Sequence, residues 1–108
     1  MTGNEYQKLA ERSNLMTGET ALSYAALGLV GEAGEIANKV KKVIRDDNNV
    51  LTDEKRKSIQ KEIGDVLWYI SRLSAELGIT LEEVMEQNIA KLSARMDKGT
   101  LQGDGDNR

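Results

Sequence analysis

Apolar residues recur at every third or fourth position along two long stretches of this chain, and that period constrains the fold more than any other feature. The first stretch covers about residues 19–45 and the second about residues 52–77. An α-helix turns about 100° per residue, so this spacing gathers the apolar side chains on one helix face. The two stripes consist of Leu22, Ala26, Leu29, Ala33, Ile36, Val40 and Val43, and of Ile59, Ile63, Val66, Ile70, Leu73 and Leu77. Because the chain has no proline to interrupt them, we expect two long amphipathic helices.

Two shorter helices are predicted on either side of this pair. One covers about residues 2–13 and begins at Thr2, and the other covers about residues 80–97 and begins at Thr80. Each threonine is followed three residues later by a glutamate, the spacing of a capping box. The last ten residues, GTLQGDGDNR, contain three glycines and almost no apolar side chains. The sequence therefore predicts an all-α domain of four helices over residues 1–98, followed by a glycine- and aspartate-rich tail over residues 99–108 that is either flexible or ordered over a site.

Composition excludes several kinds of chemistry. The 108 residues include no cysteine and no histidine, which removes disulfides, thiolate or histidine zinc sites and the usual nucleophilic triads. The formal net charge of −3 lacks the basic field of a protein that binds a nucleic-acid polymer. No apolar run approaches the roughly 20 residues of a membrane span, and the polar start is unlike a signal peptide. We therefore expect a cytoplasmic protein without membrane contacts, in which carboxylates, amines and hydroxyls do any chemistry.

Two pairs of acidic residues stand beside the apolar stripes. Glu32 and Glu35 lie on the first long helix, and Glu62 and Asp65 lie on the second. If the two helices pack antiparallel, both pairs converge on one cleft, where carboxylates without histidine or cysteine would suit Mg²⁺ or Mn²⁺. Solvent-facing acids account for the spacing about equally well. Four glycines inside the helices favour the close approach of a ligand or partner helix, since each costs about 1 kcal/mol relative to alanine: Gly28, Gly31, Gly34 and Gly64.

Two segments resemble a known family. The segment GLVGEAGEIANK at residues 28–39 and the segment KEIGDVLWY at residues 61–69 are similar to the MazG-like nucleoside triphosphate pyrophosphohydrolases, whose mark is an ExxE pair followed by an ExxD pair. The similarity extends to residues 5–12 and 88–95. Many members carry two adjacent acids at the start of the first pair, whereas this chain has Gly31 there. One acidic group fewer is therefore expected at the site.

The resemblance implies an all-α fold that assembles as a homodimer or homotetramer. It also implies Mg²⁺-dependent hydrolysis of ribo- or deoxyribonucleoside triphosphates to the monophosphate and pyrophosphate, in the housekeeping of nucleotide pools. By position, the metal ligands would be Glu32, Glu35, Glu62 and Asp65, and the residues that hold or orient the triphosphate would be Lys39, Asn88, Lys91 and Arg95. Glu35 is our preferred proton acceptor.

Several side chains have two possible interpretations. Tyr69 either stacks on a base or packs in the core, and an outward Trp68 is a subunit contact or a base platform. Gln7 is an ordinary surface residue or reads a base edge, and Asp104 and Asp106 receive no role. The acids leave little apolar reserve for the core of a small chain, so we expect a second subunit to complete it. The alternative to an enzyme is a non-catalytic helical module that binds a protein or a nucleotide.

Overall fold

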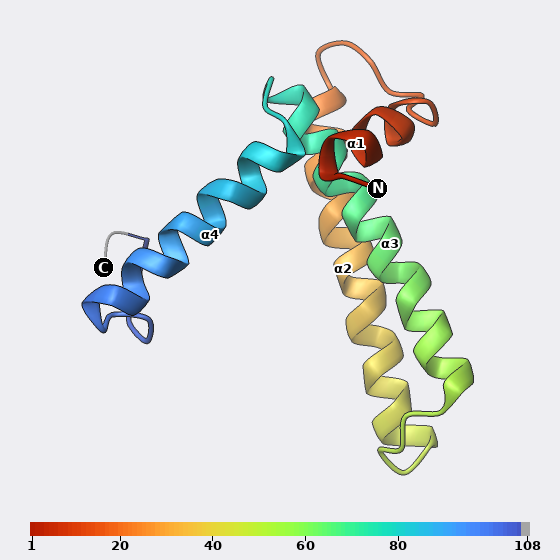
Figure 1. Cartoon of the computed structure of the whole chain (residues 1–108). Helices are drawn as coiled ribbons and strands as arrows, with labels where there is room; N and C mark the ends of the chain where they lie inside the picture. Colours follow the sequence, from red (N-terminus) through yellow and green to blue (C-terminus); the bar gives the residue numbers. More distant parts are fainter. Residues whose placement is uncertain (107–108) are drawn as a thin grey trace.

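The computed structural model describes residues 1–106, and within that range it contains four α-helices and no strands (Figure 1). The helices are α1 (Gly3–Glu11), α2 (Ala21–Asp46), α3 (Asp53–Glu76) and α4 (Leu81–Lys98). This confirms the predicted all-α class. None of the described helices combines the length and the apolar character that a membrane crossing requires.

Threonine side chains begin three of the helices. The hydroxyl oxygen of Thr2 accepts the first-turn backbone N–H of α1 at 3.1 Å, and that of Thr52 accepts the corresponding N–H of α3 at 3.2 Å. Thr80 forms a complete capping box with Glu83, because each side chain accepts the other residue's backbone N–H at 3.1 Å. These contacts satisfy amides that the first helical turn leaves without a partner.

The helices α2 and α3 pack along each other as an antiparallel hairpin, while α4 diverges from them (Figure 1). The turn between them uses Asn48 and Asn49 at φ values of 53° and 59°, a left-handed region that asparagine tolerates better than most residues. Among the described residues, α4 contacts α1 and α3 but not α2. Side chains far along α4 are therefore separated from the hairpin.

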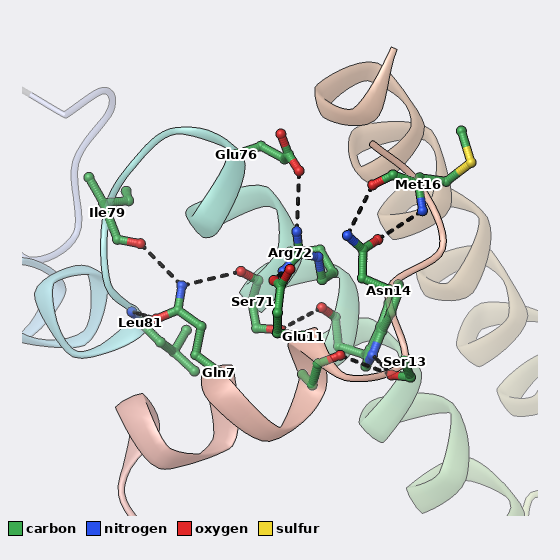
Figure 2. Close-up of polar contacts among 12 residues, drawn as sticks. Gln7, Glu11, Ser13, Asn14, Met16, Ser71, Arg72, Glu76, Ile79 and Leu81 are labelled. Carbon is green, nitrogen blue, oxygen red and sulfur yellow. Dashed lines mark hydrogen bonds and ion pairs between the residues drawn. The ribbon is translucent and has the colours of Figure 1, made fainter. Parts of the chain in front are cut away.

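A polar junction joins the short helix α1 to the corner between α3 and α4 (Figure 2). The Gln7 side chain donates to the backbone oxygens of Ile79 at 3.1 Å and Ser71 at 3.4 Å, and it accepts the backbone N–H of Leu81 at 2.9 Å. Gln7 thus has neither of the two roles considered from the sequence. It holds three elements together.

Arg72 anchors the same junction on α3. It is only 5% exposed, and its guanidinium group donates to the carboxylates of Glu11 on α1 and Glu76, the latter at 3.2 Å. A buried cation is tolerated only when it is paired in this way. The attachment of α1 to the hairpin therefore depends on charge pairing as well as apolar contact.

The chain buries little apolar volume. Its largest fully buried side chain is that of Ser71, whereas Leu27 and Val30 on α2 are 73% and 71% exposed and Ile89 on α4 is 62% exposed. The radius of gyration is 16.8 Å, compared with about 13 Å for a compact domain of this length. The fold is thus open, and its apolar faces are accessible to another molecule.

Gly28 allows α2 and α3 to approach closely. A Cβ at this position would overlap the ring of Tyr69, and that ring is held by Tyr24 at 6.4 Å and Trp68 at 5.0 Å between ring centroids. Gly31, one turn further along α2, has no atom within 4 Å of such a Cβ. The close approach of a helix expected for these glycines is therefore found at Gly28 and is absent at Gly31.

The contrast predicts opposite effects for the same substitution at the two positions. Gly28→Ala should lower the free energy of unfolding by about 1–3 kcal/mol, because it overpacks the helix contact. Gly31→Ala should raise it by about 0.5–1 kcal/mol, since alanine restricts the unfolded chain without a clash. Urea unfolding followed by circular dichroism measures both, and equal stability of the two variants would contradict the described packing.

Candidate metal centre

Three carboxylates from the two long helices meet near the middle of the hairpin. Glu32 comes from α2, and Glu62 and Asp65 come from α3. One carboxylate oxygen of each lies within 4.8 Å of the other two. We call Glu32, Glu62 and Asp65 the acid cluster. The acid cluster results from the antiparallel packing of α2 and α3. Each helix carries its acids beside the face that contacts the other helix.

The donor set of the acid cluster fits a small divalent cation. Carboxylate oxygens are the ligands that Mg²⁺ and Mn²⁺ prefer. Octahedral Mg²⁺ binds oxygens at about 2.1 Å, so neighbouring ligands stand about 3.0 Å apart and opposite ligands about 4.2 Å apart. The separation limit of 4.8 Å in the acid cluster exceeds both values, so the three side chains would have to move closer together to share one ion.

The two glutamates of the acid cluster have pKa values that shift in opposite directions. The pKa of Glu32 is raised, first by its hydrogen bond with Glu62 and then by burial and the charge of Asp65. The pKa of Glu62 is lowered, mainly because the Lys39 ammonium and then Glu32 hydrogen-bond its charged form. The repulsion among these acids, which contributes to the raised pKa of Glu32, is the kind that a bound cation would relieve.

Lys39 supplies the positive charge next to the acid cluster. Its Nζ lies 3.1 Å from Oε1 of Glu62 and donates to Oγ of Ser58 at 2.6 Å. It also donates to the backbone oxygen of Ser58 at 3.5 Å. In this structure Lys39 is a counter-ion of the acid cluster, and its predicted contact with a triphosphate stays a prediction.

Glu35 lies outside the acid cluster. It is exposed on α2, and its carboxylate is not among the three that converge. It still raises the pKa of Glu32 by repulsion, so its charge is felt at the cluster. Its roles as a metal ligand and as the proton acceptor remain predictions.

Aromatic rings form a wall beside the acid cluster. Burial raises the pKa of Tyr69 most, and the nearby Tyr24, Glu32 and Asp65 raise it further. The cavity between these rings and the loop after α1 has a volume of only about 10 Å³, about enough for one water molecule. In this structure the Tyr69 ring packs against Tyr24 and Trp68, and its stacking on a base stays a prediction.

Trp68 faces the segment that follows α1. Its indole N–H donates to Oγ of Ser13 at 2.8 Å, and its ring meets Tyr69 edge-on. Trp68 therefore does not point away from the fold, and the expected outward orientation is wrong. The reason is that the connection from α1 to α2 folds back over this side of α3, which helical period alone does not reveal.

The predicted triphosphate ligands on α4 are not brought to the acid cluster within one chain. Asn88 and Lys91 are exposed and line a shallow groove on α4 with Val84 and Gln87. Since α4 makes no contact with α2 among the described residues, this groove and the acid cluster belong to separate parts of the molecule. Asn88 falls at an apolar-stripe position of its helix, where a buried amide would be expected, but the structure leaves it exposed.

Asp106 is a functional candidate that the sequence reasoning missed. Its Oδ1 accepts hydrogen bonds from Nζ of Lys91 and from Nη2 of Arg95, both at 3.1 Å. These two cations lower the pKa of Asp106. The tail thus folds back onto α4 as far as residue 106, while residues 107 and 108 lie outside the described part. The available signal was a basic pair four residues apart, followed by a glycine-rich segment that ends in an acid.

Comparison with known proteins assigns this fold and its acids to a family. Residues 19–100 match the MazG nucleotide pyrophosphohydrolase domain. The chain is also 54% identical over 87 residues to the "Gene 37 protein" of Mycobacterium phage L5, an alignment that covers 81% of this chain and 76% of that protein. No solved structure gives a significant match. The matched segment includes all three residues of the acid cluster, and the chain belongs to the MazG nucleotide pyrophosphohydrolase domain family.

Proposed function

We propose that this protein is a Mg²⁺-dependent pyrophosphohydrolase that converts a ribo- or deoxyribonucleoside triphosphate to the monophosphate and pyrophosphate. The observation that carries the proposal is the acid cluster, three carboxylate oxygens within 4.8 Å of one another in a member of this family. Mn²⁺ should substitute for Mg²⁺, since both prefer oxygen ligands. The proposed role is housekeeping of the nucleotide pool, in the cytoplasm.

Each residue of the site has a proposed task. Glu32, Glu62 and Asp65 would hold the cation, which when bound neutralises phosphate oxygens and makes water more acidic. Glu35, exposed on the same helix as Glu32, accepts the proton of the attacking water. The positive charges of Lys39, Lys91 and Arg95 hold the triphosphate and stabilise the leaving pyrophosphate, and Asn88 orients it.

The proposal includes self-association as a homodimer or homotetramer. Exposed apolar side chains occur on both helices that carry the acid cluster, Leu27 and Val30 on α2 and Ile63 on α3, and also on α4, where Ile89 is exposed. Covering them with a second copy would remove apolar surface from water. The same step would let α4 of one copy bring its Lys91 and Arg95 to the acid cluster of the other, since α4 cannot reach α2 in its own chain.

Removing single carboxylates should abolish turnover without unfolding the chain. Asp65→Asn, Glu62→Gln and Glu35→Gln should each lower kcat/KM by about 100-fold or more, because they remove a metal ligand or the proton acceptor. Pyrophosphate release from a panel of all common nucleoside triphosphates is the measurement, and Glu19→Gln, an exposed acid before α2, is the control. Folded wild-type protein that turns over no triphosphate, or Asp65→Asn with full activity, would contradict the proposal.

Divalent cations should raise the melting temperature through the acid cluster. Mn²⁺ or Mg²⁺ at about 100 times its Kd stabilises a folded protein by about 2.7 kcal/mol. The rise should be present in wild-type protein and in Glu19→Gln, and absent in Glu62→Gln. Thermal unfolding with and without the cation tests this, and a wild-type melting temperature that does not respond would argue against a metal centre.

Hybrid oligomers test whether two chains share a site. Asp65→Asn lacks a cluster ligand and Lys91→Ala lacks a phosphate contact, so each variant alone should be inactive. If α4 acts across the interface, co-expressed chains form hybrids with one intact site, and a random dimer mixture recovers about one quarter of wild-type activity. Asp65→Asn co-expressed with Glu62→Gln is the control. If all cluster ligands come from one chain, every acid cluster in this mixture carries a defect, so no activity should be recovered. Absence of recovery in the first mixture would exclude sharing through Lys91.

A further inference from the structure

The basic pair on α4 already holds an anion from its own chain. The Arg95 side chain is 7% exposed and that of Asp106 is 80% exposed, yet one oxygen of Asp106 accepts hydrogen bonds from both Arg95 and Lys91 at 3.1 Å. The Arg95 guanidinium is thus part of the fold, whereas Lys91, with a side chain 41% exposed, and Asp106 lie on the outside. Another anion could therefore replace Asp106 at these two cations without disturbing the helix that carries them.

Two left-handed glycines deliver Asp106 to this position. Gly99 ends α4 at φ 69°, and Gly105 turns the chain again at φ 78°, conformations that other residues rarely adopt. Between them the backbone N–H of Thr100 donates to the Arg95 oxygen at 2.8 Å, and Nη2 of Arg95 donates to the Gly105 oxygen at 3.3 Å. The contact of Asp106 is therefore built into the path of the tail.

A carboxylate is an incomplete partner for these cations. One negative charge faces two positive ones, and the buried Nε of Arg95 has no hydrogen-bond partner among the described residues. A phosphate group carries more charge and more acceptor oxygens, so it can engage more of the guanidinium donors at once. Asp106 occupies Nζ of Lys91 and Nη2 of Arg95, so a phosphate that binds these two donors must first displace it.

We infer that Asp106 is an internal competitor of the nucleotide's phosphates at Lys91 and Arg95. The inference rests on the proposed function, because it assigns these two cations to the triphosphate. A tethered group acts at an effective concentration on the order of millimolar, so it lowers the apparent affinity of every phosphate ligand. The highly charged triphosphate overcomes this competition more easily than a product with fewer charges, which favours binding of substrate and release of product.

Binding of inorganic pyrophosphate to the metal-free protein tests the competition directly. Isothermal titration should show that Asp106→Asn binds pyrophosphate about threefold to tenfold more tightly than wild type, as expected from removing two partly exposed ion pairs. Asp104→Asn changes the charge of the same tail equally but touches neither cation among the described contacts, so its affinity should match wild type. The gain should disappear in Lys91→Ala/Asp106→Asn.

The outcomes separate this inference from the proposed function. Tighter binding by Asp106→Asn supports it even if no variant hydrolyses a triphosphate, in which case the proposed function alone fails. Unchanged or weaker binding by Asp106→Asn overturns it even if wild type is an active hydrolase, as does an equal gain in Asp104→Asn. Asp106→Ala, at the same exposed position, should reproduce the gain, and circular dichroism confirms that each variant retains its helices.

Discussion

Apolar burial is the constraint on which the rest of this structure depends. The two long helices bury one face against each other, but α1 and α4 attach only near one end, through the polar junction of Gln7 and Arg72. Large apolar side chains such as Leu27 and Ile89 stay exposed. A small chain gains little stability from so few buried side chains, and the second copy that we propose would cover the exposed ones. That copy would also unite the acid cluster with the basic groove on α4.

Both halves of the proposed site carry a counter-ion from their own chain. Lys39 pairs with Glu62 in the acid cluster, and Asp106 pairs with Lys91 and Arg95 at the end of α4. Each pairing offsets charge repulsion in the absence of ligand. A cation bound in the acid cluster would replace Lys39 as the partner of Glu62. A phosphate bound on α4 would replace Asp106 as the partner of Lys91 and Arg95.

Local signals predicted the helices and the acid cluster well. Apolar period located the two long helices, and the capping-box spacing at Thr2 and Thr80 located the starts of the two short ones. The i, i+3 acids on matching flanks predicted convergence, and three of the four carboxylates do converge. Glu35 is not one of them, although it follows Glu32 by three residues, the same spacing as that between Glu62 and Asp65. Helical period places these acids beside the apolar face of each helix, but it does not determine which of their carboxylates meet.

The sequence by itself determined where helices begin, which faces are apolar and which chemistry remains without histidine or cysteine, since these follow from local period, capping and composition. The tertiary structure alone decided the partners of Gln7, Trp68 and Asp106. The contacts of Gln7 and Trp68 join residues distant along the chain, and those of Asp106 depend on the turns at Gly99 and Gly105. Such geometry arises from packing of whole elements, which no short stretch of sequence encodes.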